Sequence, residues 1–245
     1  MGHPPLNLIA RLILGALIVL ASGCASLLGP ETETAAYLFH KKESTKARLD
    51  KLASRLNPSL RYLLVHQEGN LPTLLVLGNV LQVPDGPVEV WYSAQGELFK
   101  FQSGRLVGTS GLPVDWTSVR FLSNIPSWES VSVNKAPVYR RSRSELPSYL
   151  SNIEEPLRLT RMVVSADGTL RLPFSLSEAM PTSSLKSYTW FREQVGADSP
   201  HAVLSESWFA VAQENGEERV VFSRQCISAQ MCFQFLQWPL RGAGQ

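Results

Sequence analysis

The sequence predicts a mainly β protein, an antiparallel β-meander curled into a half-barrel or open barrel with one or two short helices. Three observations support this fold class. After residue 60 the hydrophobic pattern changes from helical to strand-like for most of the chain. Tight-turn dipeptides, Asp167-Gly168 and Asn215-Gly216, separate runs rich in Val, Leu and Phe. The 245 residues, 44% apolar and 18% charged, have the composition of a globular chain, which excludes disordered, collagen-like and coiled-coil classes.

The balance of basic and acidic residues limits the classes of partner that the protein is expected to bind. The chain carries 23 basic and 21 acidic residues, a formal net charge of +2. A nucleic-acid-binding protein is expected to have a dense basic face, which this composition does not supply. We therefore expect no nucleic-acid partner.

The first 24 residues have the features of a lipoprotein signal. Arg11 precedes a ten-residue apolar run over 12–21, which is short of the roughly 20 residues that span a bilayer. The run ends in Leu20-Ala21-Ser22-Gly23-Cys24, which resembles the lipobox of bacterial lipoproteins. We expect residues 1–23 to be removed and Cys24 to carry diacylglycerol and an N-acyl chain. The alternative is a buried strand with an incidental cysteine.

The expected lipid anchor predicts the location. Three acyl chains hold a protein on a membrane effectively permanently, since each buried methylene contributes roughly 0.8 kcal/mol. By the sorting rule of such lipoproteins, Ala25 in place of an aspartate favours the outer membrane, with the domain facing the periplasm. Besides these lipids, no cofactor is expected.

The mature chain begins with a tether and a helix. Residues 24–40 are predicted to link the lipid to a single β-rich domain over 41–245. A helix is predicted near 44–56, where apolar residues recur at helical spacing (Leu49, Leu52, Ala53 and Leu56). Asn57-Pro58 ends it. Its basic side is either a solvated face or a contact with anionic lipid head groups.

The strand-like runs begin at Tyr62–Val65 and Thr73–Val83. A meander of three strands is predicted over 88–107, with tight turns at Gly96 and Gly104, because such turns need a positive φ that glycine adopts freely.

Two more hairpins are predicted, over 162–172 and 209–222, around the Asp-Gly and Asn-Gly turns. Loops are predicted over 123–126 and 179–184. Leu185–Val195 fits either a short helix ended by Gly196 or another strand.

The two remaining cysteines predict a disulfide. Cys226 and Cys232 are separated by five residues, and thiols oxidise in the predicted compartment. Metal binding and redox exchange are the alternatives, but no histidine is nearby in the sequence and the spacing is not C-x-x-C. Closing this short loop is worth about 2 kcal/mol of stability.

Several motifs occur in an order that resembles the YjbF/GfcB-type lipoproteins of exopolysaccharide and group 4 capsule gene clusters. They are Trp91–Leu98, Gly104–Val107, Gly111–Asp115, Thr189–Phe191, and the closing Val220–Cys226 with Cys232 and Trp238-Pro239. The resemblance covers about residues 60 to 240. It implies an outer-membrane lipoprotein with a β-meander bent into a half-barrel. It also implies a role in producing or exporting extracellular polysaccharide, with no established catalytic residues.

No catalytic or metal site is predicted. Ser183–Lys186 matches S-x-x-K, but the S-D-N and K-T-G companions are missing. The histidines His40, His66 and His201 have no metal-ligand spacing. Glu154-Glu155 stand next to each other, so in a strand they face opposite sides, and we expect both on the solvated surface.

Two features suit binding of an acidic polysaccharide. Arg140, Arg141 and Arg143 form a basic cluster on a stretch that resembles a loop, and Trp116 and Trp128 are the tryptophans most expected to be exposed. Arginine pairs with acidic groups and indole rings stack on sugars. The alternative is that these side chains belong to the core or scaffold.

These observations predict a non-enzymatic accessory factor in exopolysaccharide or capsule production, with envelope export proteins as partners. The alternative is a polysaccharide-binding module of the periplasm, and a periplasmic glycan hydrolase is a third hypothesis.

Overall fold

The computed structural model describes residues 45–164, 170–176, 180, 186–196, 206–214 and 216–239. The predicted signal peptide, Cys24 and the tether lie outside these residues. The elements are α3 (Thr45–Ala53), β1 (Tyr62–Gln67), β2 (Thr73–Leu81), β3 (Val88–Ser93), β4 (Leu98–Gln102), β5 (Arg105–Ser110), β6 (Asp115–Phe121), β7 (Val138–Leu146), β8 (Leu150–Arg161), β9 (Thr189–Val195), β10 (Ser207–Glu214), β11 (Glu217–Ser228) and β12 (Met231–Trp238).

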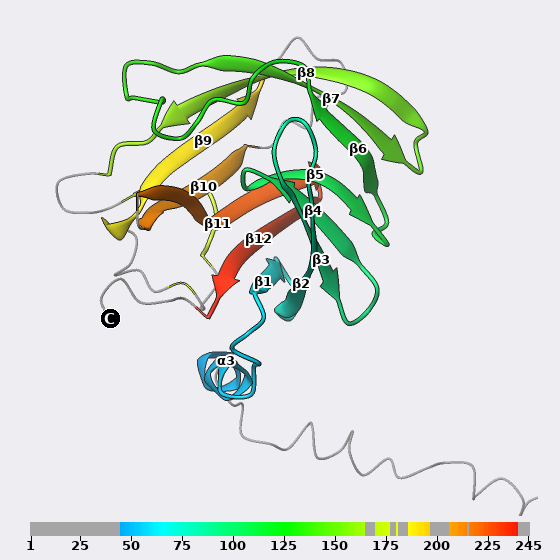
Figure 1. Ribbon diagram of the computed structural model, residues 1–245, viewed down its shortest axis with the longest axis vertical. Coiled ribbons are helices and arrows are strands. Elements are labelled where there is room, and N and C mark those ends of the chain that lie inside the picture. Colours follow the sequence, from blue (N-terminus) through cyan, green and yellow to red (C-terminus); the bar gives the residue numbers. More distant parts are fainter. Residues whose placement is uncertain are drawn as a thin grey trace, which may run out of the picture. The chain divides into compact units, whose positions relative to one another are not determined.

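The strands form one antiparallel sheet in the order β5-β4-β3-β2-β1-β12-β11-β10-β9-β8-β7-β6. Strands that follow each other in the chain are neighbours in the sheet, except at β5 and β6, and the first strand pairs with the last. The edge strands β5 and β6 lie side by side, so the sheet is nearly closed into a barrel (Figure 1). The predicted meander fold is confirmed.

The predicted short elements are largely confirmed. α3 ends at Ala53, earlier than the predicted helix over 44–56. Gly96 and Gly104 occupy the turns around β4 with φ of 98° and 77°, and the loop after β6 covers 123–126. Leu185–Val195, which fitted two structures, contains strand β9.

The hairpin over 209–222 is also confirmed, since it consists of β10 and β11. Gly216 in its turn has φ of 82°, whereas Asn215 lies outside the described residues.

The hairpin predicted over 162–172 does not form in the part of it that the structure describes. Residues 162–164 and 170–172 are not in strands, because β8 ends at Arg161 and is already paired on both sides, with β7 and β9. The side chains of Met162, Val164, Leu170 and Leu172 instead pack on one face of the sheet. Asp167-Gly168 and the predicted loop over 179–184, apart from Met180, lie outside the described residues.

Both faces of the sheet carry buried side chains. The inner face holds two clusters that join strands across the interior, as the 5.4 Å contact between the Phe99 and Phe235 rings joins β4 and β12. The outer face of the central strands carries a third cluster, with Trp190 and Phe222, onto which α3 packs through Leu49. The central strands are therefore covered on both faces and the helix is held against them.

The edge strand β5 is held by a side chain of β11. Gln225 accepts a hydrogen bond from the Leu106 backbone N–H at 2.8 Å and donates one to the Gly104 carbonyl at 2.9 Å. A neighbouring strand normally supplies both partners to an edge. The Gly104 backbone packs closely on the Val220 side chain here, since a Cβ on Gly104 would lie 2.3 Å from it. The Gln225 amide thus replaces a strand at this edge.

The opposite edge strand, β6, is held by the same segment of β11. The Trp116 indole N–H donates to the Ile227 carbonyl at 3.1 Å, and the Trp116 backbone N–H donates to Thr109 Oγ1 of β5 at 2.9 Å. The β11–β12 register shifts between Cys226 and Ser228, so Ile227 sits at a bulge, where ladder pairing is interrupted.

The predicted disulfide is present between these contacts. Cys226 and Cys232 are opposite each other in the β11–β12 ladder, with Cα atoms 3.9 Å apart, and their sulfurs are bonded. Directly opposed residues of antiparallel strands have neighbouring side chains, so the pairing of the strands brings the two sulfurs together. The disulfide therefore fastens the hairpin that supplies Gln225 and Ile227.

Within the described ranges no helix has the length and apolar character needed to cross a bilayer.

Replacing Gln225 with leucine tests the edge contact. The change removes the partner of the buried Leu106 N–H, at about 1–3 kcal/mol, and that of the partly buried Gly104 carbonyl. We expect the free energy of unfolding in urea to fall by about 2 kcal/mol or more. The control Gln213→Leu, at an exposed position of β10, is expected to change it by less than about 0.5 kcal/mol. Equal effects of the two changes would contradict the assignment.

Removing the disulfide with Cys226→Ala and Cys232→Ala together is expected to lower the free energy of unfolding by about 2 kcal/mol. The measurement is urea unfolding of the double variant beside the oxidised protein. Mass spectrometry after alkylation without reduction checks the bond itself, because a bonded pair adds no alkyl group. Alkylation of both thiols in the untreated protein would refute the pairing.

Candidate functional site

The predicted arginine cluster lies on a strand, not on a loop. Arg140, Arg141 and Arg143 are part of β7, which pairs with β6 and β8. Side chains alternate along a strand, so Arg140 faces outward while Arg141 and Arg143 face the interior and are buried. The expectation of a continuous basic loop was wrong, because the pairing of β7 divides the cluster between two faces.

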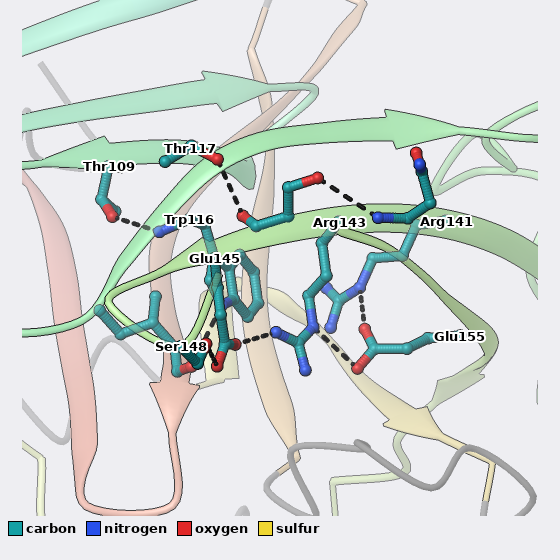
Figure 2. Close-up of polar contacts among 11 residues, drawn as sticks. Thr109, Trp116, Thr117, Arg141, Arg143, Glu145, Ser148 and Glu155 are labelled. Atoms are coloured by element: carbon teal, nitrogen blue, oxygen red, sulfur yellow. Dashed lines mark hydrogen bonds and ion pairs between the residues drawn. The ribbon is translucent and has the colours of Figure 1, made fainter. Parts of the chain in front are cut away.

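The two buried arginines share a carboxylate (Figure 2). Glu155 of β8, which is fully buried, accepts from Arg141 Nε at 2.7 Å and from Arg143 Nε at 3.0 Å. Arg143 also pairs with Glu145, which accepts a hydrogen bond from Ser148 at 2.7 Å. Burying an ion costs several kcal/mol unless its partners are well placed, and here each of the buried arginines has a carboxylate.

Trp116 completes this network. Its ring lies beneath both guanidinium groups, 4.7 Å from the Arg141 Cζ and 5.4 Å from that of Arg143, which is cation–π geometry. Trp116 is only 2% exposed. The expectation that it was exposed was wrong, because two arginines and the Ile227 carbonyl occupy its ring and its N–H.

Trp128 is also buried, at 5% exposure. Its ring lies 5.0 Å from those of Phe191 and Phe209, and the Arg105 guanidinium lies 4.1 Å from its centroid. Trp128 therefore forms part of the interior packing. Neither predicted tryptophan offers its ring to a polymer in this structure.

A second buried ionic group was not predicted from the sequence. Arg105 of β5 donates through Nε to the Tyr139 hydroxyl at 2.8 Å and contacts Glu193 at 3.1 Å. Tyr139 donates to Glu193, and burial together with the Glu193 charge raises the pKa of Tyr139 above its ordinary value. Tyr139 therefore stays a hydrogen-bond donor in the folded protein.

The sequence contains one signal for this group. Arg105 is a charged residue within Gly104–Val107, a motif that is otherwise apolar and strand-like. Its partners lie 34 and 88 residues away, and nothing local in the sequence indicates them.

The interior charges balance. The arginines 105, 141 and 143 pair with the glutamates 145, 155 and 193, which gives equal numbers of positive and negative groups. Outside, Arg140 pairs with Glu154 at 2.5 Å, and both are more than half exposed. The described part of the cluster thus has little unpaired positive charge with which to attract an acidic polymer.

The other candidate residues are dispersed. Glu154 and Glu155 face opposite sides as predicted, but Glu155 is buried, so the expectation that both lie on the surface was half wrong. His66 lies on β1, whereas Ser183, His40 and His201 lie outside the described residues. No group of three potential metal ligands occurs among the residues that the structure describes.

The substitution Glu155→Gln tests the ionic network. It leaves two buried arginines without their shared carboxylate, and breaking a buried pair costs about 3–5 kcal/mol. We expect urea unfolding to show a loss of this size. Glu154→Gln, the neighbouring change in an exposed pair, is expected to cost at most about 1 kcal/mol. A loss for Glu155→Gln no greater than that for Glu154→Gln would refute this account.

Comparison with known proteins gives a likeness of fold. No family model matches the sequence, and no curated protein matches it. The crystal structure of the hypothetical lipoprotein YmcC from Escherichia coli superposes with a TM-score of 0.54 at 14% identity, covering 81% of this chain and 98% of that one. At this identity the likeness shows a shared fold, and the nearly closed meander described here is therefore similar to that of a bacterial lipoprotein.

Proposed function

We propose that this protein is an outer-membrane lipoprotein that acts as a non-enzymatic accessory factor in the production or export of an extracellular polysaccharide. The observation that carries the proposal is the agreement between the predicted lipobox at Cys24 and a fold similar to that of a lipoprotein, YmcC. The ordered motifs resemble the lipoproteins of exopolysaccharide clusters, and this resemblance supports a role in polysaccharide production or export.

Three of these motifs lie near one another in the structure, which supports the proposal. Gly104–Val107 and Val220–Cys226 are more than one hundred residues apart, yet Gln225 joins them by two hydrogen bonds. Asp115 in the Gly111–Asp115 motif accepts hydrogen bonds from the Gly111 and Leu112 N–H groups in the turn before β6. The motifs therefore maintain the junction between β5, β6 and β11, which is a scaffolding role.

A scaffolding role also favours the non-enzymatic form of the proposal over a glycan hydrolase. A glycosidase needs two carboxyl groups placed on either side of a bound sugar. Glu155 and Glu193 are buried and occupied by arginines, so neither offers a carboxylate to a substrate. A polysaccharide-binding role is compatible with the accessory function and depends on a site outside the barrel interior.

A clean deletion in the bacterium that encodes the protein tests the proposal. We expect surface polysaccharide, measured as secreted hexose and by capsule staining, to be lost and to return with the wild-type gene. Cys24→Ala is expected to leave the outer-membrane fraction and fail to restore the polymer, because the acyl anchor is missing. Crosslinking in the envelope is expected to capture an export protein. Normal secretion by the deletion strain would overturn the proposal.

A further inference from the structure

A groove of about 630 Å³ lies on the outside of the barrel. It is bounded by the end of α3 with the loop that follows, 53–62, and by the outer face of β10, β11 and β12. Figure 1 shows α3 beside the ends of β1 and β12 that border it. Its volume is within the range of small-molecule sites.

The groove combines aromatic rings with planar polar groups. The half-buried Tyr188 and Trp238 and the buried Tyr62 line it together with the polar side chains of Asn57, Gln213, Glu214, Arg219 and Gln237. Aromatic faces pack against the C–H faces of sugar rings, while carboxylate, amide and guanidinium groups bind hydroxyls. This is the combination that a sugar chain requires.

The polar groups are held in place by one another. Arg219 donates to Glu214 at 3.1 Å and to the Gln237 side chain, and Gln237 Nε2 donates to the Val220 carbonyl at 3.1 Å. Burial and the Glu214 charge raise the pKa of Tyr188, so its hydroxyl stays a donor. Groups that are already ordered lose less entropy when a ligand binds.

The floor of the groove argues against a peptide and an acyl chain. β10, β11, β12 and β1 are central strands whose backbone groups pair with their neighbours, so an extended peptide finds no strand edge to extend. An acyl chain would cover Glu214, Arg219 and Gln237 without making hydrogen bonds to them, which is costly. A sugar chain needs no strand edge, because side chains recognise it, and the hydroxyls on its rigid rings can form hydrogen bonds with these polar groups.

We propose that this groove binds a segment of a hydroxyl-rich polysaccharide. The inference rests on the proposed role in polysaccharide production and gives that role a site of contact with the polymer. The site differs from the predicted one at Arg140, Arg141, Arg143, Trp116 and Trp128, since it lies on the central strands β10–β12, whereas those residues lie on the edge strand β6, on its neighbour β7 and on the loop between them. Arg219 is matched by Glu214 and Arg61 by Glu89, so recognition depends on hydrogen bonds and stacking more than on charge.

Binding is measured on the purified full-length lipoprotein in detergent. The probe is a fraction of oligosaccharides of about six sugars, prepared by partial acid hydrolysis of the bacterium's own secreted polysaccharide, or of its cell-associated glycan if nothing is secreted. Titration calorimetry is expected to detect saturable binding. Absence of binding to the wild-type protein would overturn the inference.

A double variant locates the site. Arg219→Met with Glu214→Gln removes the central polar pair and keeps side chains of similar length, so affinity is expected to fall at least about tenfold, the equivalent of about 1.4 kcal/mol. Tyr188→Phe removes one hydroxyl and is a second, milder change that is expected to weaken binding. The matched control, Arg140→Met with Glu154→Gln, removes another arginine–glutamate pair between strands and is expected to bind as the wild type does. Urea unfolding checks that all variants fold.

The outcomes separate the two proposals. Wild-type affinity in the groove variants, or an equal loss in the control, would overturn the groove as the site. The deletion phenotype is scored independently. If the deletion abolishes the polymer while a strain carrying the groove variants secretes normally, the accessory function stands and the groove inference falls.

Discussion

The structure depends on three consecutive residues of β11, which hold both open edges of the sheet. Gln225 binds the backbone of β5, Ile227 accepts the Trp116 N–H of β6, and Cys226 between them is bonded to β12. An unpaired edge exposes donors and acceptors to other chains. A sheet with this strand order has two such edges, β5 and β6. Here the Gln225 side chain and the carbonyl at the Ile227 bulge bind some of their hydrogen-bonding groups, although β5 and β6 do not pair with each other as strands. β5 and β6 can therefore lie side by side without a ladder of backbone hydrogen bonds between them.

The contact between the edge strands β5 and β6 also accounts for the charged side chains in the interior. Arg105 begins β5 and its partner Glu193 is on β9, so this ion pair crosses the barrel and fixes the edge strand relative to the far wall. Arg141, Arg143 and Glu155 hold β7 to β8, and the Trp116 ring packs against both arginines. Buried ion pairs contribute little net stability, but unpaired buried charges are very costly. Such groups favour one register of the strands, and the carboxylates of Glu155 and Glu193 are already engaged by arginines.

The proposed function therefore depends on the outer surface of the barrel. The interior is filled by aromatic rings and balanced charges, whereas the groove beside α3 combines exposed and half-buried polar groups with aromatic rings. α3 lies 21 residues after Cys24 in the sequence. The proposed role as an accessory lipoprotein requires contact surfaces for a polymer and for export proteins, and the outer surface is where the structure offers them.

The sequence by itself determined the class of fold, the meander over 88–107, the β10–β11 hairpin and the cysteine pair, because each depends on side-chain alternation, on turn glycines or on residues close in the chain. The lipobox is equally local and stays a prediction. Only the tertiary structure decided that Arg141, Arg143, Trp116 and Trp128 are buried. Strands β7 and β8 are rich in polar residues, and the inward-facing Arg141 and Arg143 are compatible with a core only because Glu155 lies opposite them. Partners that lie far apart in the chain are determined by the pairing of the strands, which no local pattern specifies.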